Sequence, residues 1–144
     1  MANDARATLP HLLARRGYRL TGPRRAVLET LSASTEPLTV AEIHRRLGPG
    51  QADLVSVYRT VNLMVKVGLL RATDAIKAGV RYELAEEFTG HHHHLICQGC
   101  GRIEDLEGCL LPDEALARVH QRVRLKRRFR VTEHELRLFG LCQE

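Results

Sequence analysis

Apolar residues in the first half of the chain recur at intervals of three and four, the spacing that places them on one face of an α-helix. The four helices predicted from this pattern span about residues 8–17, 23–34, 39–47 and 53–67. Pro23 suits the first position of the second helix, and Thr39 with Glu42 has the spacing of a capping box for the third. Asp53 can cap the fourth helix, and Gly68 is a natural stop for it.

The fourth helix has two unlike faces. Its apolar stripe consists of Leu54, Val57, Val61, Met64 and Val65. The side predicted to face solvent carries Ser56, Arg59, Thr60, Asn62 and Lys66. A polar face is most often simply solvated, but this one lacks a carboxylate and ends a series of short helices, as the recognition helix of a helix-turn-helix does. Because arginine binds guanine or phosphate in the major groove, we predict that this face contacts nucleic acid.

Two short segments rich in strand-forming residues follow, at 69–73 and 80–84, and a turn-like loop joins them. They are predicted to pair as a hairpin, the wing of a winged-helix domain, with Glu83 where the wing leaves that domain. Residues 85–90 are polar and are interpreted as a hinge. The predicted organisation is therefore a winged-helix domain in residues 1–84, a hinge, and a second domain in residues 91–144.

The second half mixes strands with one helix, which makes the chain as a whole α+β. A strand is predicted at 91–96, and a second at 102–106 would pair with it and bring Asp105 near its histidines. A helix opens at Pro112, with acidic residues in its first turn. The apolar face of this helix is predicted to consist of Leu116, Val119 and Val123. Residues 129–139 are predicted to be extended.

The charge is divided unevenly between the halves. The chain of 144 residues has a net charge of +5. Residues 1–84 hold 13 Lys and Arg against 7 Asp and Glu, a net of +6, whereas residues 85–144 hold 9 against 10, a net of −1. All four cysteines and six of the eight histidines lie in the second half. The half suited to a polyanion and the half suited to metal ions are therefore different halves.

No apolar run approaches the roughly 20 residues that a membrane-spanning helix needs, and the first residues carry charges without the apolar core of a signal peptide. We therefore expect a cytoplasmic protein with no membrane partner. In that compartment the cysteines are expected to bind metal rather than to form disulfides.

The stretch from His91 to Gly101 contains four consecutive histidines followed by a Cys-x-x-Cys motif, Cys97 to Cys100. Imidazole and thiolate are the side chains that borderline-soft divalent metals prefer. On a strand, successive side chains point to opposite faces, so His91 and His93 would face one way and His92 and His94 the other. One strand would then contribute to two separate metal sites.

Two other interpretations of this stretch fit the sequence less well. A histidine tag would lie at a terminus, but this run lies inside the chain. A thioredoxin-type redox pair would lie in a βαβ pattern, and none surrounds the Cys-x-x-Cys motif. A metal site is therefore the favoured prediction, with zinc as the expected ion.

Together these motifs resemble the ferric uptake regulator family of bacterial metal-sensing repressors, over nearly the whole chain. The residues that carry the resemblance are Arg19-Leu20-Thr21 with Arg24, Val57 to Asn62, Tyr82-Glu83-Leu84, His91 to Cys100, and the pattern from His134 to Cys142. The resemblance implies a winged-helix DNA-binding domain, a hinge and an α/β dimerisation domain. It also implies that Arg24, Ser56, Tyr58, Arg59 and Thr60 contact DNA.

The resemblance further implies three metal sites. A regulatory site would use Glu83, His92, His94 and Asp105. A second site would use His91, His93 and His134. A structural zinc would be held by Cys97, Cys100 and Cys142. The alternation argument separates the two histidine pairs independently of the resemblance.

The chain departs from the family pattern at three places. It ends at Glu144, one residue before a fourth cysteine would fall, so Cys109, a partner or water would have to complete the structural site. Glu36-Pro37 stands where a histidine ligand often precedes the third helix, which removes one regulatory ligand unless Glu36 substitutes for it. His93 stands where iron-sensing members commonly have an aspartate, and this substitution resembles some zinc-sensing members. The position that matches the family's second-site acid is occupied by Pro112.

The function implied is that of a homodimeric repressor that binds palindromic double-stranded DNA operators when metal is bound and controls metal-uptake genes. Zinc, ferrous iron and manganese all suit a regulatory site of histidine and carboxylate. A peroxide-sensing regulator of the same family, which uses bound iron to oxidise a ligand histidine, is the alternative. A zinc hydrolase or deaminase would need an open metal position and a general-base glutamate in motifs that this chain lacks, so no enzyme is expected.

Overall fold

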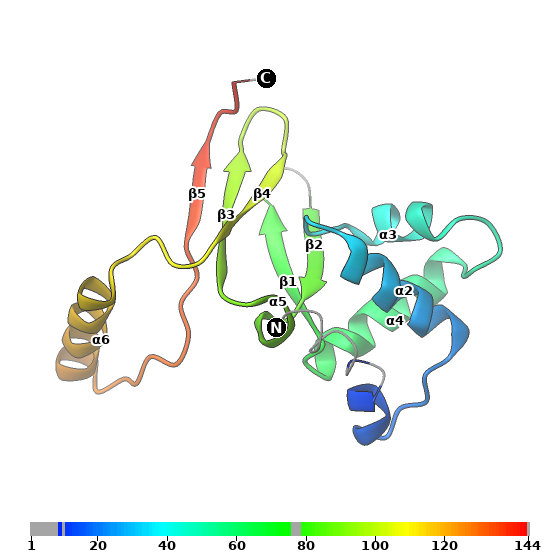
Figure 1. The fold of residues 1–144 in the computed structure, drawn as a ribbon, viewed down its shortest axis with the longest axis horizontal. Coiled ribbons are helices and arrows are strands. Elements are labelled where there is room, and N and C mark those ends of the chain that lie inside the picture. Colours follow the sequence, from blue (N-terminus) through cyan, green and yellow to red (C-terminus); the bar gives the residue numbers. More distant parts are fainter. Residues whose placement is uncertain (1–8, 10, 76–78, 144) are drawn as a thin grey trace.

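The computed structural model describes residues 9, 11–75 and 79–143, and these form two parts that lie side by side (Figure 1). The first part contains a short helical segment at residues 11–15 and three longer helices. These three helices are α2 (Gly22–Ala33), α3 (Val40–Leu47) and α4 (Leu54–Lys66). The antiparallel hairpin of β1 (Leu70–Ala75) and β2 (Gly79–Leu84) completes it. The predicted winged helix is confirmed.

One hydrophobic core holds this first part together. It is formed mainly by the helical stripes and the base of the hairpin, and its fully buried members include Leu13, Val27, Ile43, Val57, Val61, Met64 and Leu69. The wing is attached to the helices by a bridge between Leu38 and Tyr82. The predicted hinge contains a short helix, α5 (Glu86–Thr89), whose Phe88 is buried in the same core.

The predicted helix caps are present. Thr39 and Glu42 form a reciprocal capping box at α3, and Asp53 Oδ1 accepts a hydrogen bond of 2.8 Å from the Ser56 N–H at α4. Gly68 follows α4 with a φ of 73°, a conformation that glycine adopts without strain. Local sequence signals therefore set these boundaries.

Glu42 is expected to make the stability of the first part depend on pH. Its carboxylate accepts hydrogen bonds from Thr39 and from Arg81 on the wing, at 2.8 Å and 2.9 Å. Burial raises the pKa of Glu42, but these hydrogen bonds outweigh burial and bring the pKa below its ordinary value of 4.5. The stabilisation is therefore complete above 4.5, the ordinary value, and is lost as the pH falls through the lower pKa of the folded state.

The Glu42→Gln variant should lose about 1–2 kcal/mol of stability at pH 7, the usual scale for a helix cap with a charged hydrogen bond. Hydrogen exchange at the α3 amides measures this difference, with the exposed Glu29→Gln as control. Variant and wild type should converge once the pH falls below the lowered pKa of Glu42. A difference that persists there would mean that the charge of Glu42 is not responsible.

The second part is a three-stranded sheet with one long helix. Its strands are β3 (His92–Cys97), β4 (Ile103–Glu107) and β5 (Arg137–Gly140), in the order β4-β3-β5. β4 is antiparallel to β3 and β5 is parallel to it. The predicted pairing of β4 with the histidine strand is confirmed, whereas only the last residues of the predicted extended segment 129–139 form a strand.

Helix α6 (Asp113–Arg127) lies away from the rest of the chain (Figure 1) and buries none of its residues. The predicted apolar face of Leu116, Val119 and Val123 is therefore not covered within one chain, and Val119 is 53% exposed. A helix of this length is marginal in water without tertiary packing. Its acidic first turn and basic last turn help through the helix dipole, but a partner surface is needed. Among the described residues, no helix is both long enough and apolar enough to cross a bilayer.

Candidate metal centres

The first cluster lies at the seam between the two parts. It joins Glu83 from β2, His92 and His94 from β3 and Asp105 from β4, with one ligand atom of each within 4.8 Å of the others. Glu83 lies 3.1 Å from His92 Nε2 and 3.3 Å from His94 Nε2. Asp105 lies directly opposite His94 in the β3–β4 register, 3.6 Å from its Nε2. The structure thus brings together all four residues predicted for the regulatory site.

Glu83, His92 and His94 are each less than 10% exposed, so these side chains interact with one another with little screening by solvent. Burial raises the pKa of Glu83, but hydrogen bonds from His92 and His94 outweigh it and hold the pKa far below its usual range. The hydrogen bond to Glu83 raises the pKa of His92, and burial raises the pKa of Asp105. The cluster is therefore an ionised carboxylate that holds positive charge beside it.

His92 is oriented so that its Nε2 faces the cluster. Its Nδ1 lies 2.9 Å from the Gly90 carbonyl, which accepts a hydrogen bond from the Nδ1–H and so keeps the proton on that nitrogen. Arg71 donates to Glu83 Oε1 at 2.6 Å and approaches His92 Nε2 at 2.9 Å. A protonated His92 donates to Glu83, whereas a neutral one accepts from Arg71. His92 Nε2 therefore either carries a proton or accepts a hydrogen bond from the Arg71 guanidinium. A metal ion bound to this nitrogen would replace both.

A cavity of about 820 Å³ opens beside this cluster and gives a path for an ion. Its lining includes Glu36, Glu83, His92 and Asp105. Glu36 forms an ion pair of 2.9 Å with Arg46, and it does not belong to the cluster of close ligand atoms. The described structure therefore gives no support for Glu36 as a replacement for the family's histidine.

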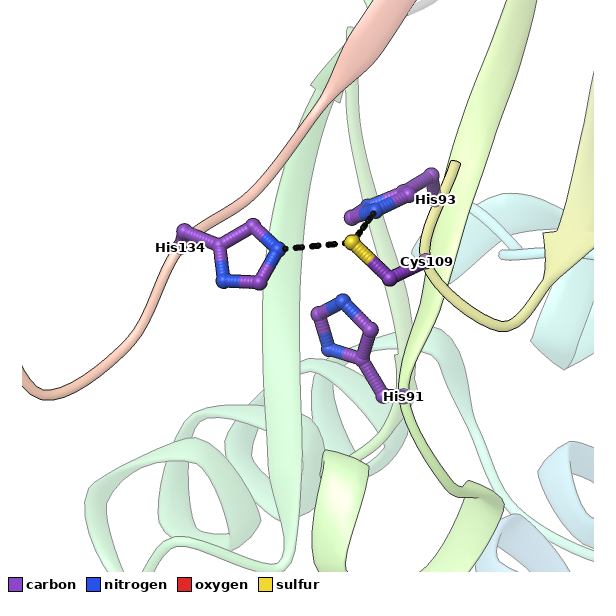
Figure 2. A group of neighbouring side chains, drawn as sticks. All are labelled: His91, His93, Cys109 and His134. Carbon is purple, nitrogen blue, oxygen red and sulfur yellow. Dashed lines mark hydrogen bonds between the residues drawn. The ribbon is translucent and has the colours of Figure 1, made fainter. Parts of the chain in front are cut away.

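The second cluster lies on the opposite face of β3 (Figure 2). His91, His93 and His134 meet there, with ring centroids 4.6 to 5.4 Å apart. Cys109 Sγ lies among them, 3.5 Å from His93 Nε2 and 3.3 Å from His134 Nε2. The alternation predicted for the histidine strand is confirmed. The suggestion that Cys109 completes the cysteine site is wrong, because the β4–α6 connection carries it to this cluster instead.

The third cluster contains Cys97, Cys100 and Cys142. Cys142 Sγ lies 3.4 Å from Cys97 Sγ and 3.5 Å from Cys100 Sγ, because β5 runs parallel to β3 and ends beside the Cys-x-x-Cys turn. Backbone N–H groups of Cys100 and Cys142 donate to Cys97 Sγ and lower its pKa to about 6. The three thiols predicted for a structural zinc do converge. Within the described residues, no other histidine, cysteine or carboxylate joins them.

The residues predicted to contact DNA are not all accessible. Tyr58 and Arg59 are exposed on α4. Arg24, on α2, is partly exposed. Ser56 donates to Asp53 as part of the helix cap. Thr60 is only 6% exposed, so its prediction as a DNA contact is wrong: it lies on the core side with Val57 and Val61.

The exposed face of α4 begins instead with Leu54 and Val55, 50% and 57% exposed. Leu54 was predicted to be buried from its spacing, but the first turn of α4 projects beyond the core. Apolar side chains in the major groove can contact the methyl group of thymine, so these two residues are further candidates for DNA contact that helical spacing did not indicate.

Comparison with known proteins gives a consistent result. The model of the ferric uptake regulator family matches residues 15–139. The ferric uptake regulation protein of Bacillus subtilis is 32% identical over 133 residues, which cover 87% of this chain and 83% of that protein. The peroxide-responsive repressor PerR of Staphylococcus saprophyticus is 28% identical over 134 residues, 92% of this chain and 85% of that protein.

A solved structure gives the same picture of the fold. The Helicobacter pylori ferric uptake regulator Fur, described as having three functional metal binding sites, superposes with a TM-score of 0.77 at 24% identity. The match covers 99% of this chain and 92% of that one.

Proposed function

This chain belongs to the ferric uptake regulator family, and we propose that it is a cytoplasmic, metal-dependent homodimeric repressor of metal-homeostasis genes that binds palindromic operators. Proteins of this family are metal-binding transcription regulators that work as DNA-binding dimers, not enzymes. Beyond these family properties, we propose the repressor role, the metal ligands and the way in which metal controls DNA binding.

One observation carries the proposal: the carboxylate of Glu83, on the wing, lies within 3.3 Å of two buried histidines of the other part. A metal ion bound by Glu83, His92, His94 and Asp105 would have ligands from both parts and would hold them in one arrangement. In a dimer, that arrangement sets the distance between the two α4 helices, which must match two operator half-sites.

Metal acts here by shifting an equilibrium. The ion needs only to bind the DNA-competent arrangement more tightly than the other arrangements. By linkage, DNA must then tighten metal binding by the same factor. Without metal, Arg71 on β1 supplies the positive charge beside Glu83 and reaches His92 of β3 at 2.9 Å. A metal ion would add His94 and Asp105 to this link between the two parts.

The exposed apolar residues of the second part support dimerisation. Val119, Leu125, Phe129, Leu138 and Phe139 are 40% to 73% exposed on α6, β5 and the segment between them. Large apolar side chains that one chain leaves exposed on two neighbouring elements of the sequence are suited to burial against a second copy. We assign the dimer interface to this surface, which leaves α4 free for DNA.

The donor sets suggest which metals bind. Three thiolates suit zinc, and we assign a structural zinc to Cys97, Cys100 and Cys142. The mixed imidazole and carboxylate set of the regulatory site suits zinc or ferrous iron, and manganese as well. Metal analysis of the purified protein, combined with DNA binding under each ion, decides between them.

Arg59→Ala tests the assignment of α4 as the recognition helix. Arg59 is exposed in the first half of α4, the part of a recognition helix that lies nearest the bases. Its loss should weaken binding to duplexes selected from a random library by the metal-loaded protein by about 1–3 kcal/mol, roughly 5- to 150-fold. Fluorescence anisotropy measures the affinity, and Arg130→Ala, an exposed arginine of the second part, is the matched control. Equal losses in both variants would contradict the assignment.

A peroxide-sensing regulator is the second candidate, favoured by the presence of Asp105 in the regulatory cluster and by the similarity to PerR. In that case bound ferrous iron would direct oxidation by peroxide to a ligand histidine. Mass spectrometry of the peptide from His91 to Cys100 after peroxide treatment distinguishes the two, because a pure metal sensor should gain no oxygen on histidine.

A further inference from the structure

The second cluster contains a residue that the family pattern does not supply. Cys109 reaches this cluster from the connection between β4 and α6. The same connection contains Pro112, which stands where the second-site acid of the family is expected. We propose that Cys109 is the fourth ligand of this site, which makes it a zinc site of three imidazoles and one thiolate. The inference rests on the proposed second site and deepens it by naming the ligand and the class of metal.

The distances fit one tetrahedral ion. With Zn–S near 2.3 Å and Zn–N near 2.05 Å, a tetrahedral site places nitrogen and sulfur about 3.5 Å apart. Cys109 Sγ lies 3.5 Å from His93 Nε2 and 3.3 Å from His134 Nε2, and all four ligand atoms lie within 4.8 Å of one another. Figure 2 shows the three rings arranged around the sulfur. The sulfur is thus already at tetrahedral distance from two of the three imidazoles, and His91 lies close enough to complete the site.

His91 is already prepared for metal binding. Its Nδ1 makes a short hydrogen bond with Glu86 Oε1, and its Nε2 is buried without a hydrogen-bond partner among the described residues. A carboxylate on one ring nitrogen and a free, buried second nitrogen is the arrangement found at metal-binding histidines. An unpartnered buried nitrogen is costly, and coordination removes that cost.

Metal binding would also change β5. The backbone N–H of Leu136 donates to His93 Nδ1 at 3.3 Å. Coordination through Nε2 places the ring proton on Nδ1, so this weak hydrogen bond must be given up. The coordinate bond between His93 Nε2 and zinc is far stronger than this hydrogen bond. The backbone amide of Leu136, the residue immediately before β5, would therefore report metal binding.

The thiolate distinguishes this site from the regulatory one. Sulfur ligands favour zinc over ferrous iron and manganese, which suit the carboxylate-rich site at Glu83. Cys109 and His134 lie on the two connections that flank α6, and both would be joined to β3 through the ion. A zinc ion here therefore fixes the base of the helix that we assign to the dimer interface.

Cadmium-113 NMR of the full-length protein tests the proposal, because the resonance of cadmium moves to lower field with each thiolate ligand. The wild type should give three resonances, for sites with no thiolate, one thiolate and three thiolates. Cys109→Ser should remove the one-thiolate resonance or move it to high field and leave the other two in place. Those two resonances report that the variant is folded.

A second variant tests the orientation of His91. Glu86→Gln should weaken zinc binding at this site about 10- to 100-fold, the usual effect of removing a carboxylate behind a metal-binding histidine. The neighbouring exposed Glu87→Gln should have no effect. Competition with a chromophoric chelator gives the affinities.

Two results would overturn the proposal: a wild-type spectrum without a one-thiolate resonance, or a Cys109→Ser spectrum identical to that of the wild type. Neither depends on DNA binding. Failure of the metal-dependent repressor function would instead appear as metal-independent operator affinity with the one-thiolate resonance intact.

Discussion

Replacing His92 and His94 with alanine is expected to abolish the effect of metal on operator binding. Both rings are buried against Glu83, so the variant loses two of the four ligands that join the wing to the second part. Coupling between two sites is commonly worth about 1–3 kcal/mol, so wild-type DNA affinity should rise roughly 5- to 150-fold on adding metal. The double variant should keep only the affinity of the metal-free protein, as measured by fluorescence anisotropy or mobility shift.

The control for this experiment is His11→Ala, which removes an exposed histidine that belongs to none of the three clusters. It should retain the full response to metal. A double variant that still binds operator more tightly with metal, to the wild-type extent, would show that the seam between the two parts is not where metal acts.

The second large effect is expected at the cysteine cluster. Among the described residues, the buried apolar cluster of the second part consists only of Ile96 and Ile103. Burial of a large aliphatic side chain contributes about 1.5–3 kcal/mol, which is far less than the entropy lost on ordering three strands. Structural zinc contributes roughly 10–16 kcal/mol to the folding of small zinc domains, so metal and dimerisation must supply the difference.

Cys97→Ser should therefore unfold the β3-β4-β5 sheet and dissociate the dimer, while the winged-helix part, with its own core, stays folded. Thermal unfolding followed by NMR should show loss of the sheet signals with the α2–α4 signals retained. Zinc content should fall by at least two ions per chain, because the unfolded sheet also loses the zinc site of His91, His93, Cys109 and His134. Gln98→Ser, between the two cysteines, is the matched control. A Cys97→Ser protein with an unchanged melting temperature would contradict a structural role for zinc.

The first part could be predicted closely because its signals are local. Thr39 with Glu42, Asp53 and Gly68 specify the ends of helices through hydrogen bonds within a few residues of each cap. Thr60 and Leu54 were misassigned because helical spacing gives the direction of a face but not where the core ends. The packing of α4 against α2 and α3 decides that, and it is not a local property.

The metal clusters could be predicted as far as strand alternation allowed. The two-residue period separated His92 and His94 from His91 and His93, and the pairing of β4 placed Asp105 beside the first pair. Cys109 could not be placed, because it lies on an irregular connection whose path depends on where α6 begins. The extended segment 129–139 was overestimated for a related reason: only residues that pair with β3 become a strand.

The most direct test of the proposed mechanism is a calorimetric titration of the regulatory metal into the zinc-loaded protein, with and without operator duplex. If metal at Glu83, His92, His94 and Asp105 selects the DNA-binding arrangement, operator must tighten metal binding by the same factor by which metal tightens operator binding, about 5- to 150-fold. Metal affinity that is the same in the presence and absence of operator would contradict it.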